Sequence, residues 1–491
     1  MPTNVAPSAS STLPPATSPV ARPTRDPILD VLRVFGIALV VLQHWLMPVL
    51  AYDDSQLQTG NALSAPGAWI VTWVSQVMPF VFIASGAAAA ISLRRRTARP
   101  DGGGGRAAGQ TVAPWIAARL QRLALPVLAL AAVWIVLPHL MLVAGLPSQP
   151  VELAGEFVGA LLWFLIVLVL ISSLTPVLER IADRFRGWEL LAAAAGALLV
   201  DLVRFTGWEP LGYVNVLMVW GAVYQIGIHY SRGRLTWMRG WRAWAVAAMA
   251  FGVVALAVGA GPYPPSMIGM PGAEASNMNP PGAVLLALTA GQLGIAMALR
   301  PAIVRWARQP VVDALLQRAN SSAMTLYLWH TPALVLVAGV VVLGLGGHTP
   351  DPTTWAWWER LPTWLFLLAM TVSVLVKRVA PVERIVLPMR DVSVRRVTAA
   401  TVLVAAGLLG LTVVGFGPSV TFALVGPVTS TAAIAAGLLL LVRWPAAGMV
   451  QRRRELGGRS SSSRGVRTSA RTLSAANTAA VPIASRMPVM V

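Results

Sequence analysis

Three ionisable side chains interrupt the apolar stretch ILDVLRVFGIALVVLQHW, residues 28–45. Asp30, Arg33 and His44 fall within about a third of the circumference of a helix with about 3.6 residues per turn. Imidazole titrates near neutrality, so His44 can take the proton of a hydroxyl group at a buried site. Arg33 can bind an anion or a developing negative charge, with Asp30 orienting it. These residue types favour general-base chemistry on one helix face.

Each of these residues also has a structural explanation. Arg33 can extend its guanidinium to the lipid headgroups and pair with Asp30. His44 can be a neutral histidine at the membrane interface, packed beside Trp45. Ionisable groups within membrane spans usually face a polar cavity, which is the functional alternative. The residues alone leave both explanations open.

The helix that carries these residues belongs to a chain too apolar for a soluble fold. Of its 491 residues, 56% are hydrophobic and 12% are charged. Apolar runs without the period-two pattern of barrel strands recur about twelve times, each near the roughly 17–25 residues that cross a bilayer. We therefore expect an all-α polytopic membrane protein. Its spans are expected at residues 27–49, 68–93, 115–145, 153–178, 188–205, 212–230, 243–260, 282–299, 322–345, 361–379, 396–415 and 420–442.

Arginine clusters orient these spans. Loops such as 94–106 and 231–242 carry several arginines, whereas 51–67, 145–152 and 259–282 carry no Lys or Arg. Positive loops stay in the cytoplasm, so we expect a multi-pass plasma-membrane protein with both termini cytoplasmic. The formal net charge of +19 has the same origin, and we expect no nucleic-acid partner.

The two ends of the chain are polar. Residues 1–25 are rich in Pro, Ser, Thr and Ala and lack the apolar core of a signal peptide, so we expect a disordered cytoplasmic tail. Asp26 suits an N-cap and Pro27 a first helical position, which predicts where the first span begins. Residues 443–491 are basic and Ser-rich at their start, and we expect a disordered tail exposed to solvent or lipid headgroups.

The helix with Asp30, Arg33 and His44 resembles the first helix of the acyltransferase 3 family of bacterial integral membrane acyltransferases. Each further motif is common in apolar sequence, but together they follow the order of that family. They are PFVFIASGAAAAISLRRR (79–96) with Ser85 and Gly86, ARLQRLALPVL (118–128) with Arg119 and Arg122, LLWFLIVLVLISSLTPVL (161–178) with Trp163, and NSSAMTLYLWHTPAL (320–334) with Tyr327 and His330.

This resemblance implies a membrane domain over residues 26–380 with about ten helices, and it leaves two additional helices within 381–442. It also implies transfer of an acyl group, expected to be acetyl, from cytosolic acyl-CoA to a hydroxyl group. The acceptor is expected to be a carbohydrate, glycolipid or similar cell-envelope molecule. Partners are then acyl-CoA, this acceptor and membrane lipids, with acyl-CoA a co-substrate and no cofactor tightly bound.

His44 is the candidate general base, because it shares a helix face with Arg33 and Asp30. Arg119 and Arg122 form a fork suited to the CoA phosphates, although the positive flank of an ordinary span explains them as well. The other candidates for the same cavity lie on different helices. They are His330, Tyr327, Ser85 and Trp163.

Structural explanations remain for these additional candidates. His330 and Tyr327 lie on one helix face, where a hydrogen-bonded core pair is an equal alternative. Ser85 precedes Gly86, and a close helix contact explains such a pair better than catalysis does. The chain has no cysteine and no motif with metal-ligand spacing, so we expect no metal site.

The alternative function is a secondary transporter or flippase of a lipid-linked or small-molecule substrate. Such proteins usually show paired halves broken by Gly or Pro at matching positions. Here the polar first helix has no counterpart in the seventh or eighth expected span, 243–260 and 282–299. Consumption of acyl-CoA distinguishes the two functions, and we favour acyl transfer.

Overall fold

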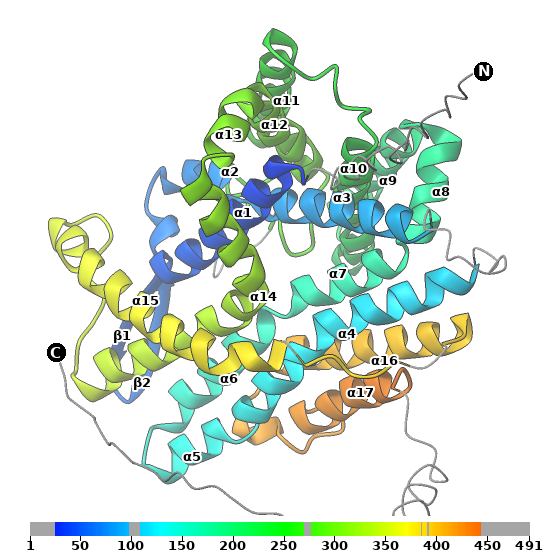
Figure 1. The fold of residues 1–491 in the computed structure, drawn as a ribbon. Coiled ribbons are helices and arrows are strands. Elements are labelled where there is room, and N and C mark those ends of the chain that lie inside the picture. The colour runs from blue at the N-terminus through cyan, green and yellow to red at the C-terminus, as the bar shows by residue number, and fades with distance from the viewer. Residues whose placement is uncertain (1–24, 98–108, 270–275, 384, 390–391, 443–491) are drawn as a thin grey trace, which may run out of the picture. The chain divides into compact units, whose positions relative to one another are not determined.

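A computed structural model describes residues 25–97, 109–269, 276–383, 385–389 and 392–442. Helices dominate this part of the chain (Figure 1). The elements are α1 (Pro27–Leu46), β1 (Pro48–Asp53), β2 (Gln56–Asn61), α2 (Thr72–Ser75), α3 (Met78–Thr97), α4 (Gly109–Trp134), α5 (Leu137–Val143), α6 (Ser148–Ala160), α7 (Trp163–Ser173), α8 (Thr175–Phe185), α9 (Trp188–Arg204), α10 (Asn215–Ser231), α11 (Trp241–Gly259), α12 (Val284–Ala298), α13 (Arg300–Ala307), α14 (Pro310–Ala338), α15 (Trp355–Glu383), α16 (Val394–Val414) and α17 (Pro427–Leu439). The expected tails, 1–25 and 443–491, lie almost wholly outside the described residues.

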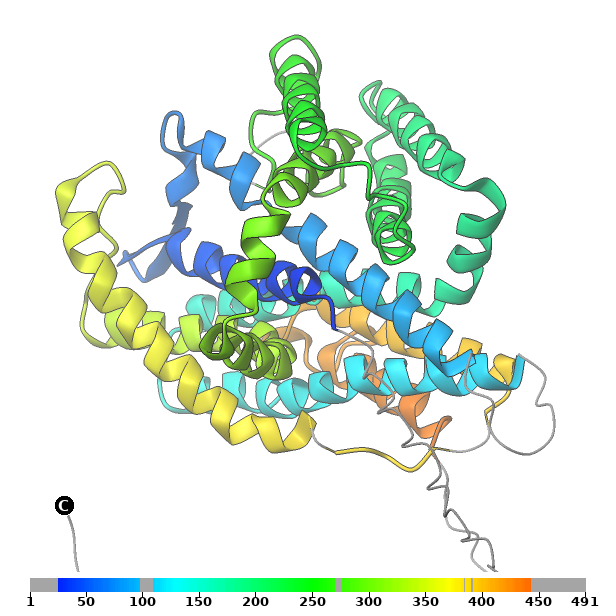
Figure 2. The same cartoon turned by 45° about the horizontal axis from the view of Figure 1, so that its top comes forward.

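The predicted start of the first helix is confirmed. Asp26 is the N-cap of α1, and its carboxylate accepts a hydrogen bond of 3.2 Å from the backbone N–H of Ile28. Pro27 occupies the first turn, where its missing N–H costs no helical hydrogen bond. α1 packs against α3 and α14, and Figures 1 and 2 both show it beside these two helices.

Glycines bring several helix pairs into backbone contact. Gly86 of α3 faces the carbonyl of Tyr224 on α10, and Gly227 of α10 faces the carbonyl of Ile83 on α3. The close helix contact expected at Ser85 and Gly86 is therefore present. In a bilayer the lipid tails are as apolar as the side chains, so helices associate mainly by close van der Waals packing. Small residues allow the backbones to approach closely enough for this.

Twelve spans are not confirmed. Within the described residues, nine helical segments are long and apolar enough to cross a membrane, or ten if α12 and α13, bent by 62° at their junction, count as one span. The predicted spans 188–205 and 420–442 correspond to α9 and α17, which have 17 and 13 residues. The all-α class holds, apart from one two-stranded sheet.

That sheet replaces part of the loop expected at 51–67. β1 and β2 pair antiparallel, with Pro48 opposite Asn61. Asp54 and Ser55 both have positive φ, 45° and 65°, as the two central residues of a tight hairpin turn require. Six residues per strand give a short ribbon that needs other elements to stabilise it.

Two neighbouring segments supply that support. The side-chain amide of Gln149 at the start of α6 accepts from Leu57 N (2.9 Å) and donates to Leu57 O (3.2 Å). On the other strand, Leu50 N donates to the hydroxyl of Thr349 (3.2 Å), and Thr349 N donates to Leu50 O (2.8 Å). The hairpin is therefore fixed between α6 and the segment that follows α14.

The contact between α3 and α10 predicts a position-specific effect of a single methyl group. We expect Gly227→Ala to lower the stability by about 1–3 kcal/mol, because its Cβ would overlap the backbone of α3. Gly221→Ala on the same helix is the control, since no atom lies within 4 Å of its Cβ position. Thermal unfolding in lipid nanodiscs measures both variants, and equal midpoints for the two would contradict the packing described here.

Candidate active site

Two histidines from distant parts of the chain meet between α1 and α14. His330 Nε2 lies 3.2 Å from His44 Nδ1, and the ring centroids are 5.2 Å apart. His330 is fully buried, whereas His44 is half-buried. The sequence suggested that His330 shares a cavity with His44, and the structure brings the two side chains into contact.

The hydrogen bonds around this pair assign the proton positions of the neutral rings. His330 Nδ1 lies 2.6 Å from the carbonyl oxygen of Tyr327, which can only accept, so Nδ1 carries the hydrogen. His330 Nε2 then holds a lone pair and accepts from His44 Nδ1–H. It follows that His44 Nε2 keeps a lone pair that is available to take a proton.

Two tryptophans hold the backbone around the histidines. Trp45 Nε1 donates to the carbonyl oxygen of His330 at 3.1 Å. Trp364 Nε1 of α15 donates to the carbonyl oxygen of Trp45 at 2.9 Å. These bonds link α1, α14 and α15 at the level of the imidazole pair, and they limit sliding of one helix past another.

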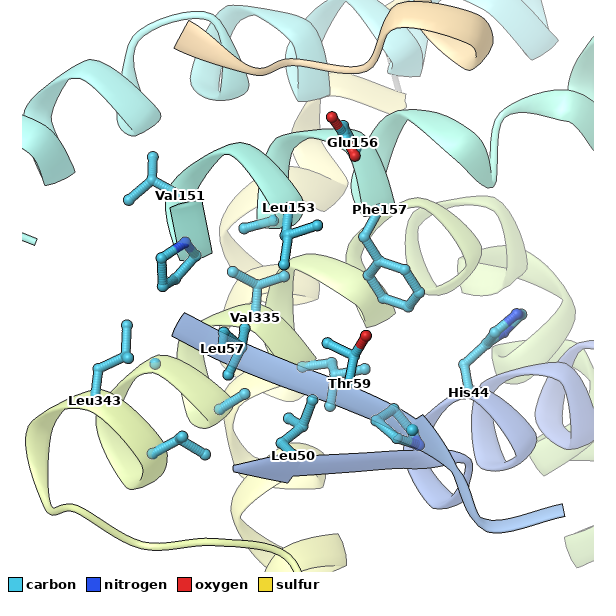
Figure 3. A pocket seen from close by; sticks show the side chains of 18 of the residues that line it. His44, Leu50, Leu57, Thr59, Val151, Leu153, Glu156, Phe157, Val335 and Leu343 are labelled. Carbon is cyan, nitrogen blue, oxygen red and sulfur yellow. The ribbon is translucent and has the colours of Figure 1, made fainter. Parts of the chain in front are cut away.

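His44 lines a cavity of about 460 Å³. Its walls come from the hairpin, α6 and α14, and Figure 3 shows His44 at one end and Leu343 at the other. Among the described residues that line it, the polar side chains are those of His44, Thr59, Asn61 and Glu156, and the rest are apolar or glycine.

A second group of candidate side chains lies toward the other end of α1. The guanidinium of Arg33 is close enough to Asp30, Arg119 and Arg122 for their charges to interact. Arg119 lies over the ring of Trp115 at 5.7 Å, and its buried Nε has no hydrogen-bond partner among the described residues. Three guanidinium groups in this setting attract an anion.

Asp30 makes different contacts from those expected. Its carboxylate forms an ion pair with Arg25 and accepts a hydrogen bond of 3.1 Å from Asn320 Nδ2. No ion pair joins Asp30 to Arg33 within the described part of the chain. The two side chains interact only by longer-range electrostatic attraction. This arrangement leaves the positive charge of Arg33 available to a ligand.

The polar face of α1 is not open along its whole length. Ile37 and Val41, between Arg33 and His44 on that face, are buried in the core. The cavity lined by His44 does not include Arg33, so a ligand that contacts both groups must pass Ile37 and Val41. Eleven residues between Arg33 and His44 correspond to about 16 Å of helical rise.

Other predicted candidates lie near the pair but outside the cavity lining. The Tyr327 hydroxyl donates to the carbonyl oxygen of Leu161, and its ring lies 5.2 Å from that of Phe164. The Trp163 ring lies 6.0 Å from that of Trp220, and Ser85 is buried on α3 near α10. Of these three, only Tyr327 has a ring contact with the pair, at 5.9 Å from His330.

Sequence reasoning missed Glu156, Phe157 and the hairpin residues. Glu156 lay inside an expected span, 153–178, and an ionisable residue there was a usable signal of function. Phe157 and the hairpin carry no ionisable residue pattern that could have indicated the cavity. They line it only because of tertiary contacts. Among the described residues, no group of three or more His, Asp or Glu side chains could hold a metal ion.

A comparison with protein families gives a match to the acyltransferase 3 model, described as an acyltransferase domain, over residues 26–377. The chain belongs to the acyltransferase 3 family. This match covers more than half of the chain and includes α1, α4 and α14, which carry the histidine pair and the arginine group. Curated proteins and solved structures gave no match.

The histidine pair predicts a supporting role for His330 in this acyltransferase. We expect His330→Ala to lower kcat about 10–100-fold with little change in KM, because His44 loses the side-chain acceptor that orients its ring. His330→Gln should recover part of the rate, since its amide oxygen can accept from His44 Nδ1. Steady-state acyl transfer by the purified variants measures this, and an alanine variant as fast as the native protein would contradict it.

Proposed function

We propose that the protein is a membrane O-acyltransferase that moves an acyl group from cytosolic acyl-CoA to a hydroxyl group of a cell-envelope acceptor. The acceptor class is a carbohydrate, a glycolipid or a similar molecule. The observation that carries the proposal is that His44 lines a cavity and contacts His330, whose Nε2 accepts the hydrogen bond of His44 Nδ1–H. Family membership supports acyl transfer as the chemistry.

In the proposed reaction, His44 Nε2 takes the proton of the acceptor hydroxyl as its oxygen attacks the thioester carbonyl carbon. A C–O bond forms and the C–S bond breaks. The CoA sulfur leaves as a thiolate and receives the proton from the His44 imidazolium. During this step His330 Nε2 accepts from His44 Nδ1–H and stabilises the positive ring.

The arginine group supports a binding site for the donor. CoA carries several phosphate charges, and guanidinium groups bind phosphates by paired, charge-assisted hydrogen bonds. Arg33, Arg119 and Arg122 supply three such groups. Because Arg33 lies about 16 Å along the helix from His44, we assign it to the carrier and not to the reacting carbonyl. The arginine-rich loops support a cytosolic position for this end of α1.

His44 is the base in the proposed reaction. We expect His44→Ala to lower kcat for CoA release by about 10²–10⁴-fold, because the acceptor hydroxyl loses its proton acceptor. The assay is acyl-CoA-dependent release of CoA thiol by purified protein in lipid, with a membrane glycolipid extract as acceptor. Absence of thiol release by the native protein with every acyl-CoA would instead favour the transporter hypothesis.

Arg119 and Arg122 form the donor site in the proposed reaction. We expect Arg119→Ala and Arg122→Ala each to raise the KM for acyl-CoA about 10–100-fold, because a charged hydrogen bond to phosphate is worth about 1.5–3 kcal/mol. Arg395→Ala is the matched control, since it removes the same charge from an exposed position on α16. An equal change in all three variants would show a general effect of charge and would refute a specific phosphate site.

A further inference from the structure

The cavity beside His44 is larger and more apolar than an acetyl group requires. An acetyl group takes about 60 Å³ if each of its carbons takes roughly the 30 Å³ share of a water molecule. The cavity holds about 460 Å³. Most of this volume therefore has a different occupant when the enzyme is at work.

The walls exclude a sugar from most of that volume. Leu153, Val335 and Leu343 present hydrocarbon to the cavity and offer no partner to sugar hydroxyl groups. Hydroxyl groups buried without hydrogen bonds would destabilise binding. Polar side chains are few, and Figure 3 shows Glu156 at the margin of the group of labelled side chains.

The position of His44 favours the acyl group over a lipid tail of the acceptor. In the proposed reaction, the acyl chain is bonded directly to the carbonyl carbon that must lie beside His44 Nε2. The lipid tail of a glycolipid is separated from the reacting hydroxyl by polar sugar. Figure 3 shows His44 at one end of the cavity and Val151 and Leu343 toward the far end. This shape suits a chain that starts at the base and extends away from it.

We infer that the donor carries a medium-chain acyl group, of about eight to ten carbons, which occupies this cavity during transfer. At about 30 Å³ per carbon such a chain fills about half to two thirds of the volume. This inference rests on the proposed function and replaces the expectation of acetyl. The hairpin and α6 then act as the walls that select chain length.

Gly339 offers a way to shorten the cavity without disturbing the backbone. It lines the cavity, its φ is −56°, and no atom lies within 4 Å of its Cβ position. Gly339→Phe therefore fills apolar space without backbone strain. Gly252→Phe on α11 is the matched control, because its Cβ position is equally open and the residue is exposed, away from the cavity.

The experiment measures kcat/KM for acetyl-, butyryl- and octanoyl-CoA with full-length protein in nanodiscs, using CoA thiol release. Each buried methylene contributes up to about fourfold, so we expect octanoyl-CoA to exceed acetyl-CoA at least tenfold in the native protein. Gly339→Phe should lose this preference, because its ring occupies space that the longer chain needs. Gly252→Phe should behave as the native protein does.

Two results would overturn the inference while leaving the proposed function in place. Equal use of acetyl- and octanoyl-CoA by the native protein would show that the cavity does not hold the acyl chain. If Gly339→Phe lowered kcat/KM equally for all three acyl-CoA donors, the cavity would bind the acceptor and not the acyl chain. Absence of thiol release with all three donors would refute the proposed function itself, and this inference with it.

Discussion

The hydrogen bond between His44 and His330 is the interaction on which the site depends. It joins α1 to α14 in a setting where an unpaired ring nitrogen would be costly. The carbonyl of Tyr327 sets the tautomer of His330, and His330 in turn sets that of His44. A backbone atom therefore determines which nitrogen of His44 carries the hydrogen and which keeps a lone pair. Trp45 and Trp364 hold the helices at this level, so the chemistry rests on a rigid contact of three helices.

The walls of the cavity depend on elements outside the family match. α6 presents Leu153 and Phe157 to the cavity, whereas Gly155 and Gly159 face the end of α16. Phe416 N donates to Gly155 O at 3.0 Å, and the Glu152 carboxylate accepts from Ser419 N at 2.9 Å. The end of α16 and the segment that follows it thus support the face of α6 that points away from the cavity. α17 packs against α16 and so contributes only indirectly.

The sequence singled out Asp30, Arg33 and His44 as candidates, because they stand out in an apolar run. It did not predict the contact of His44 with His330, since 286 residues separate them and only helix packing brings them together. The contacts of Asp30 differed from those expected: it pairs with Arg25, which lies before α1, and with Asn320, which only the packing of α14 brings near. The polar hairpin was interpreted as a loop because Gln149 and Thr349, which fix it, lie far away in the chain. The count of twelve spans is not confirmed, because hydropathy does not show the lengths of α9 and α17, which have 17 and 13 residues.

The most direct test of this account is a cryo-EM structure of the protein with a non-hydrolysable octanoyl-CoA analogue. We expect the phosphates to contact Arg119 and Arg122, the carbonyl group to lie beside His44, and the chain to extend toward Leu343. A nucleotide bound away from the arginine group, or a carbonyl group out of reach of His44, would contradict the central claim that the histidine pair acts on a donor bound along α1.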